Sequence, residues 1–227
     1  MPTGVGSNIH FHDKPGSAFS GVPSFKTRYV GRTGPGVWAT DGHGHGTHCA
    51  GTIGSVGDNN VGVVGIRKDP NLFRFHVGKG LSNEGFGYES DILAAVWGCV
   101  DRGSRVISMS LEGAESSETA DEFYRDMYTN HGVLIVAAAG NEGDTGGLHF
   151  PAAYPAVVSV AAVDENEVRP GFSQCNEQVE ITAPGVDVLS TYANAQYKLS
   201  CLVSFPRMYQ YTDSERLAPI SQTHRRT

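Results

Sequence analysis

Short apolar segments alternate with amphipathic segments between about residues 40 and 190 of the chain. The continuous apolar runs at residues 133–139 and 157–163 are typical of strands that are buried on both faces in a parallel sheet. Residues 71–77 alternate apolar and polar side chains as in a half-buried strand, and residues 106–111 read as a further strand. The pattern therefore predicts at least four strands in the middle of the chain.

Three further segments have the spacing and composition of helices. Residues 90–100 place apolar side chains on one stripe, with Ser90 as an N-cap and Asp91 as a favourable charge in the first turn. Residues 117–130 are amphipathic, and the segment after Gly44 is rich in small residues, as a closely packed helix requires. Strands alternating with such helices predict the α/β class, in three layers with a mostly parallel central sheet flanked by helices.

The two ends of the chain lack a sustained pattern. Residues 1–40 are rich in glycine, proline and serine and contain one short strand candidate at residues 25–30. Residues 201–227 have no helical or strand period and end in a polar, basic stretch, which favours a disordered tail. We therefore expect one domain at residues 1–200 and a divergent tail at residues 201–227.

Composition narrows the class of protein without identifying it. The 227 residues are 39% hydrophobic and 18% charged, as in ordinary globular domains, and suffice for one substantial core. The net charge of −7 argues against nucleic-acid binding, and no apolar run reaches the roughly 20 residues of a membrane-spanning helix. No signal peptide is visible, and four irregularly spaced cysteines leave the redox compartment open.

The segment TDGHGHGTHCAG at residues 40–51 carries the densest candidate chemistry. Its His43, His45, His48 and Cys49 have the atoms that zinc prefers, but the HExxH spacing is absent and no second cluster follows. The alternative is that one histidine is a general base at the start of a helix. There the positive end of the helix dipole disfavours imidazolium and keeps the base neutral.

The stretch GHGTHCAGTIGS resembles the histidine motif of the subtilisin-like serine proteases, or subtilases, in the proteinase K-like form with cysteine after the second histidine. The resemblance implies that His45 is the general base of a catalytic triad. It also implies that His48 is a buried structural residue and that His43 fills a variable position. Family-like segments follow in order, so the resemblance covers about residues 38–200.

Three of these segments imply a substrate cleft and an oxyanion hole. GFGYESD resembles the backbone on one side of the cleft, and SMSLEG resembles the strand that pairs with substrate on the other. AAAGN resembles the strand end that carries the oxyanion-hole asparagine, here Asn141, for which a turn asparagine is the alternative. Glu112 stands where the family usually has glycine, so we expect an altered or narrowed cleft. The implied substrate-binding residues are Gly85, Phe86, Gly87, Ser110, Leu111, Glu112, Ala138 and Gly140.

The segment DNNVGVVGI at residues 58–66 resembles a loop that binds calcium in many subtilases. The side-chain oxygen of Asn59 and the carbonyl oxygens of Gly57, Val61 and Val63 would form a site of hard oxygen ligands. An asparagine-rich turn is the alternative, since Asn59 and Asn60 suit left-handed backbone geometry. Calcium would be a structural ion, and no cofactor is required for the reaction.

Two family motifs are missing at the ends of the resemblance. The triad aspartate belongs in DTG, whereas residues 2–4 read PTG, with Pro2 at the carboxylate position. The nucleophile belongs in GTSMATP, whereas the chain departs from the pattern after Ser200 and places Val203 at the serine position. Ser204 lacks the flanking residues of the nucleophile helix, and Cys201 has no motif support. We expect a catalytic domain truncated at both ends, by an incomplete gene model or by real loss, that folds poorly alone.

The resemblance implies a serine endopeptidase that hydrolyses peptide bonds in polypeptides, and an extracellular location. The expected partner is a polypeptide substrate or inhibitor, without nucleic acid or membrane, and the expected state is a monomer. Because the serine and aspartate motifs are missing, we expect the chain as written to be inactive. The alternative is an inactive remnant or a peptide-binding pseudoprotease, which peptide affinity without turnover would reveal.

Overall fold

The computed structural model describes residues 8–12, 32–33, 41–58, 60, 62–67, 69, 74–143, 147–193 and 196–201. The helices are α1 (His45–Gly54), α2 (Glu89–Val100) and α3 (Glu118–Thr129). The strands are β1 (Asn8–His12), β2 (Arg32–Thr33), β3 (Arg74–Gly78), β4 (Val106–Met109), β5 (Leu134–Ala138), β6 (Val157–Val163), β7 (Val179–Pro184), β8 (Val188–Tyr192) and β9 (Gln196–Ser200). The strand expected at residues 25–30 and most of the expected tail lie outside the described residues, as do Pro2, Val203 and Ser204.

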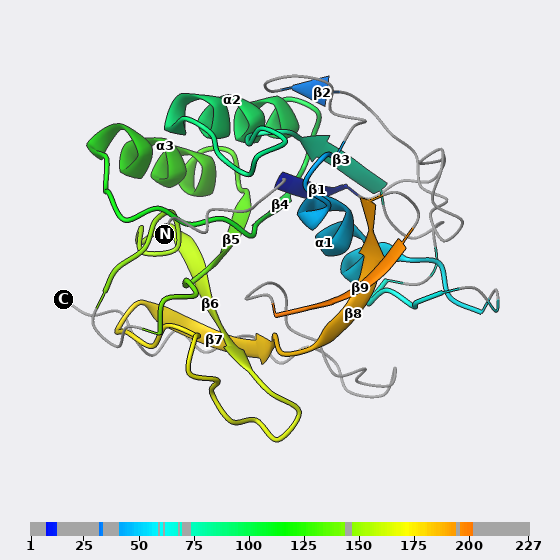
Figure 1. The fold of residues 1–227 in the computed structure, drawn as a ribbon. Helices are drawn as coiled ribbons and strands as arrows, with labels where there is room; N and C mark the ends of the chain where they lie inside the picture. The colour runs from blue at the N-terminus through cyan, green and yellow to red at the C-terminus, as the bar shows by residue number, and fades with distance from the viewer. Residues whose placement is uncertain are drawn as a thin grey trace, which may run out of the picture.

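The described strands form one large sheet and one hairpin (Figure 1). The sheet has seven strands in the order β2-β3-β1-β4-β5-β6-β7, and β8 pairs with β9 in a separate antiparallel sheet. The pairs β2–β3, β4–β5, β5–β6 and β6–β7 are all parallel. The mostly parallel sheet expected from the alternating pattern is therefore confirmed.

β1 is the exception to the parallel arrangement. It lies between β3 and β4 and is antiparallel to both, with Ile9 opposite Val77 on one side and Ser108 on the other. In the described part of the chain, β1 is thus the strand that joins β2–β3 to the four strands β4–β7. The sequence pattern did not predict a strand at these residues.

Helices lie on both sides of the large sheet. Figure 1 shows α2 and α3 together on one side and α1 on the other, where α1 packs against the β8–β9 hairpin. Between the sheet and the α2–α3 layer lies the main apolar core, in which Val96, Ile107, Met127 and Ile135 are at most 1% exposed. The three-layer arrangement predicted for the fold follows from these two helical layers. No helix in the described ranges is both long and apolar enough to span a bilayer.

Most element bounds lie within a few residues of the predicted ones. β6 has the predicted bounds, and α3 begins after Ser117, whose hydroxyl accepts a hydrogen bond from the Ala120 N–H (3.3 Å). The prediction of Ser90 as the N-cap of α2 is wrong. The carbonyl of Tyr88 accepts the hydrogen bonds from the N–H groups of Asp91 (3.0 Å) and Ile92 (3.2 Å), so the helix begins at Glu89 without a side-chain cap.

Candidate active site

The side chain of Asp41 holds the first turn of α1. Its carboxylate accepts hydrogen bonds from the N–H groups of Gly44 (2.7 Å) and Thr47 (2.8 Å) and from the Thr47 hydroxyl (2.8 Å). A helix N-terminus otherwise leaves such N–H groups without partners. Burial opposes ionisation of Asp41, but these hydrogen bonds outweigh it and hold the pKa of the carboxyl below its ordinary value. Asp41 therefore anchors the helix that presents His45.

His45 is the first residue of α1, and only 8% of it is exposed. Burial, together with the neighbouring His43 and His48, lowers the pKa of His45 to about 3, against an opposing effect of Asp41. The imidazole is therefore neutral near pH 7, as expected at this helix end, with burial rather than the dipole as the main cause. In the described part of the chain, no carboxylate is hydrogen-bonded to this ring.

A short chain of contacts joins His45 to the end of β4. The Cys49 sulfur, one helical turn along, lies 3.8 Å from Nδ1 and 3.9 Å from Nε2 of His45. The Cys49 thiol donates to the Ser110 hydroxyl, with 3.5 Å between sulfur and oxygen. Ser110 directly follows β4, whose carboxyl end is the edge of a parallel sheet at which ligands bind in many α/β folds. The two predicted sites, His45 and residues 110–112, therefore adjoin each other.

The other two histidines of the cluster have contacts of their own. His48 Nε2 lies 3.0 Å from the Val188 carbonyl oxygen and 3.1 Å from that of Lys198, so the ring donates to both strands of the β8–β9 hairpin. His43 lies edge-on to His45 with 6.4 Å between ring centroids, and its carbonyl oxygen accepts a hydrogen bond from the Tyr192 hydroxyl (2.7 Å). Across the described ranges, no group of three or more histidine, cysteine or acidic side chains is arranged to hold a metal ion.

Asn141 follows β5 and Gly140, whose φ of 124° lies in the region that favours glycine. Both donors of Asn141 point at the carboxylate of Glu112. The backbone N–H lies 3.1 Å from Oε2, and the side-chain Nδ2 lies 3.4 Å from Oε1. The amide proposed as the oxyanion donor is therefore hydrogen-bonded to the residue that departs from the family pattern.

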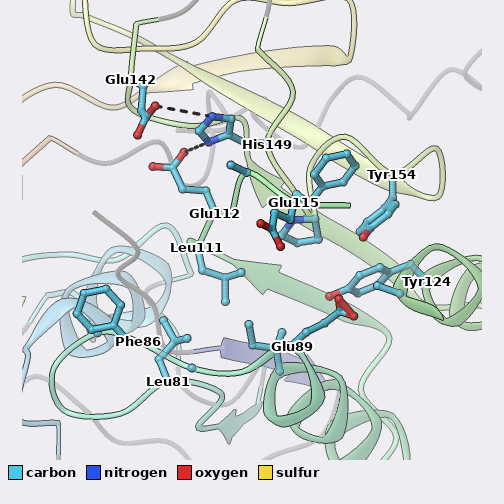
Figure 2. A pocket seen from close by; sticks show the side chains of 18 residues that line it. Leu81, Phe86, Glu89, Leu111, Glu112, Glu115, Tyr124, Glu142, His149 and Tyr154 are labelled. Carbon is cyan, nitrogen blue, oxygen red and sulfur yellow. Dashed lines mark hydrogen bonds and ion pairs between the residues drawn. The ribbon is translucent and has the colours of Figure 1, made fainter. Parts of the chain in front are cut away.

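Glu112 has a second partner in His149. The His149 Nδ1 lies 3.1 Å from Glu112 Oε2, and its Nε2 lies 4.0 Å from an oxygen of Glu142. The side chains of Glu112 and His149 are 8% and 11% exposed, whereas Glu142 is 55% exposed at the surface. Figure 2 shows these three side chains at one end of a pocket of about 330 Å³.

The pocket lies between the predicted cleft segments. Of the predicted substrate-binding residues, it is lined by Gly85, Phe86, Gly87, Leu111 and Glu112. Ser110, Ala138 and Gly140 are buried next to it and do not line it. A Cβ added to Gly140 would lie 2.4 Å from Glu112 Oε2, so Gly140 sits directly against the acidic end.

Sequence reasoning missed His149, Glu142 and Glu115 as lining residues of this pocket. His149 immediately precedes FPAAYP and lies within the residues, about 38–200, that the resemblance covers. Like Glu112, His149 is an ionisable residue within the part of the chain that resembles the family, and this could have marked it as a candidate site residue. The pairing itself joins residues 37 positions apart and needs the fold to be seen.

The candidate calcium loop is only partly described. Gly57 and Val63 lie in the described ranges, whereas Asn59 and Val61 do not. Asp58 and Asn60 have positive φ values of 59° and 56°, which is the backbone geometry of a tight turn. Both interpretations of this loop, a calcium site and a simple turn, therefore stay open.

Comparisons with known proteins give the family. The model of the Subtilase family matches residues 17–215. Subtilisin DY from Bacillus licheniformis is 39% identical over 161 residues, covering 70% of this chain and 57% of that protein. Subtilisin Savinase from Lederbergia lenta is 36% identical over 198 residues, covering 87% of this chain and 66% of that protein. The crystal structure of the psychrophilic subtilisin-like protease Apa1 from an Antarctic Pseudoalteromonas species matches with a TM-score of 0.69 and 37% identity, covering 81% of this chain and 45% of that one.

The chain therefore spans between about half and two thirds of the length of these relatives. The sequence match and the fold match agree with each other. The seven-stranded sheet and its flanking helices are those of a subtilisin-like protease. The chain belongs to the subtilase family.

Proposed function

We propose that the protein is a serine endopeptidase that hydrolyses peptide bonds in polypeptides, with His45 as general base and Asn141 as oxyanion donor. The observation that supports this most is the contact chain from the neutral His45 through Cys49 to Ser110, beside the pocket. This contact chain places a proton acceptor, His45, near the carboxyl end of β4 and near the pocket in which we propose that substrate binds. Family membership supports the reaction class.

The buried state of His45 sets a requirement on the mechanism. With a pKa of about 3, the imidazole accepts a proton poorly, because burial destabilises its cation. A general base near neutral pH needs that cation stabilised, as the triad carboxylate does in serine proteases. We therefore expect the active enzyme to place a carboxylate against the ring, together with a serine nucleophile.

Extended substrate would lie between residues 85–87 and residues 110–112, by addition of a strand to the exposed backbone. We also propose an extracellular, monomeric enzyme, on the family resemblance alone. Calcium binding by the loop of residues 57–63 is likewise proposed on the family resemblance alone. None of these features is needed for the chemical step.

The test uses the full-length product of the transcript and two readouts. We expect it to cleave casein and to react with a fluorophosphonate probe, which labels activated serines. His45→Ala should lower cleavage by at least roughly 100-fold, the usual contribution of a general base. The matched control, His43→Ala, should retain activity, because His43 contacts the ring only edge-on.

A peptide-binding pseudoprotease is the second candidate. The observation that favours it is that the Nδ2 of Asn141 already donates to Glu112 instead of pointing at an empty oxyanion position. If the full-length protein binds peptides but gives neither cleavage nor probe labelling, hydrolysis is wrong and this second function stands.

A further inference from the structure

The pocket beside the candidate active site is strongly acidic. Its described lining residues include four carboxylates, from Glu89, Glu112, Glu115 and Glu142, and one ionisable base, His149. Among the described residues of its lining, none is lysine or arginine. Figure 2 shows Glu112 and Glu142 at one end, beside His149, and Glu89 nearer Tyr124 at the other. An acidic pocket of this kind attracts a cationic ligand and repels an anionic one.

The walls of the same pocket are apolar. Leu81, Leu111 and Phe150 line it, and Figure 2 shows Leu111 between Glu112 and Glu89. A ligand that fits both features has an apolar stem and a positively charged tip. Lysine and arginine side chains have this build, since they bury their methylene stems on apolar surface while the charged head finds a polar partner.

Glu112 is the carboxylate best placed to receive the charged tip. Its side chain is 8% exposed, and it accepts from both donors of Asn141 and lies 3.1 Å from His149 Nδ1. A carboxylate offers about four lone-pair directions, so three contacts leave one unused. A buried negative charge also gains most from a cationic partner, because the surroundings screen it weakly.

A second polar side chain, Gln174, lies behind Gly140, next to Glu112 and outside the described lining of the pocket. Gln174 is fully buried, and within the described structure neither its Oε1 nor its Nε2 has a hydrogen-bond partner. The Cβ position of Gly140 would lie 2.4 Å from Glu112 Oε2 and 2.7 Å from Gln174 Oε1, so both oxygens converge beside Gly140. A buried amide is rarely left unpaired, so the Glu112 end of the pocket retains unused hydrogen-bonding capacity.

We propose that this pocket binds a lysine or arginine side chain of the polypeptide substrate, and that Glu112 is the residue that selects it. The inference rests on the proposed function in one respect, that the ligand is a polypeptide. It does not depend on turnover, because a basic side chain would be selected equally by an enzyme and by a peptide-binding pseudoprotease.

The experiment measures peptide binding to the full-length protein by calorimetry. The probes are three acetylated peptide amides that differ at one position, which carries lysine, norleucine or glutamate. Norleucine keeps the apolar stem and lacks the charge. We expect lysine to bind about tenfold more tightly than norleucine, the effect of one charged hydrogen bond, and glutamate to bind least. Higher salt should weaken the binding of the lysine peptide more than that of the norleucine peptide, because salt screens the attraction between charges.

Two variants test the role of Glu112. Glu112→Gln should reduce the ratio of lysine to norleucine affinity to near one, whereas Glu165→Gln, an exposed glutamate in the turn after β6, should leave it unchanged. Equal or tighter binding of norleucine, a ratio unaltered in folded Glu112→Gln, or no binding of any peptide would overturn the proposal. Should Glu112→Gln fail to fold, the salt series on the unaltered protein decides, because a ratio insensitive to salt contradicts it.

The outcomes of this experiment and of the cleavage assay are separable. Lysine selectivity without hydrolysis would contradict the endopeptidase proposal and support the acidic pocket as a site for a basic side chain. Hydrolysis of peptides without lysine selectivity would support the endopeptidase proposal and contradict the proposal that the pocket selects a basic side chain.

Discussion

At the scale of single residues, the protonation of His45 is the property that matters most. Its pKa of about 3 lies below the ordinary value of about 6.5, because burial disfavours the cation. Between these two values the unfolded chain binds a proton that the folded protein does not. The free energy of unfolding should therefore fall as the pH drops from about 6.5 towards 3, by up to about 1.4 kcal/mol per pH unit from this residue.

The check is urea unfolding of the 227-residue chain at several pH values, with His45→Asn beside the unaltered chain. Asparagine does not titrate, so the variant should show a shallower loss of stability between pH 6 and 4. The buried His76, whose pKa is lowered to about 4, contributes a slope of the same sign in both proteins and serves as the internal reference. Identical slopes would mean that the imidazole of His45 is not buried as described.

The residues of the site were predictable to different degrees. The helix start at His45 follows from small residues and a short motif, so the sequence predicted both its place and its neutral state. Glu112 was recognised as a departure, but its hydrogen bonds to Asn141 and its contact with His149 were not. Local patterns contain no distances between residues 29 and 37 positions apart, and a charged residue gives no periodic signal.

At the scale of elements, α1 depends on one carboxylate outside it. Asp41→Asn keeps the size of the side chain and removes its charge, so the hydrogen bonds from Gly44 and Thr47 weaken. We expect a loss of about 1–2 kcal/mol in the free energy of unfolding at pH 7. Because the pKa of Asp41 is lowered on folding, its contribution is present above pH 4 and should fade below it.

The measurement is the difference in unfolding free energy between the two proteins at pH 7 and pH 3. Asp101→Asn is the matched control, since Asp101 pairs with Arg102 at 3.8 Å on the surface and should matter little. An Asp41→Asn protein as stable as this control would show that the cap is dispensable.

The β8–β9 hairpin is tied to the molecule through α1. Besides the His48 ring, the Ser190 hydroxyl donates to the His48 carbonyl (2.8 Å), and the Thr191 hydroxyl donates to the Thr47 carbonyl (2.9 Å). His48→Leu would leave the carbonyls of Val188 and Lys198 without their side-chain donor. We expect a loss of about 1–3 kcal/mol, with faster amide hydrogen exchange confined to the hairpin. Exchange that rises equally in β5 and β6 would contradict a local role for this histidine.

The elements themselves show what periodicity can and cannot predict. The continuous apolar runs of β5 and β6 predicted the bounds of these strands closely, although Leu134 at the start of β5 is exposed, so the burial predicted on both faces holds for β6 better than for β5. β1 was missed, because NIHFH is short and lies in a segment without a sustained pattern. The direction of a strand in a sheet is set by tertiary contacts, which a local pattern does not contain.

At the scale of the whole molecule, two parts of the large sheet are joined by a short strand, β1. In the described structure, β1 alone links β2–β3 with β4–β7, through its pairing with β3 on one side and β4 on the other. The two parts also carry different pieces of the site, since residues 85–87 follow β3 and residues 110–112 follow β4. We therefore expect the pairing of β1 to influence the width of the acidic pocket.

Ile9→Pro tests this dependence directly. Ile9 pairs with Val77 and with Ser108, and proline has no N–H for a ladder in the middle of a sheet. We expect a loss of at least about 2 kcal/mol in the free energy of unfolding and weaker binding of the lysine peptide, because the walls of the pocket separate. Ile9→Val keeps the backbone N–H and should leave both the free energy of unfolding and the affinity for the lysine peptide unchanged. A proline variant that unfolds and binds like the valine control would mean that β1 does not hold the sheet together, and that β3 and β4 reach their positions through the helical layers instead.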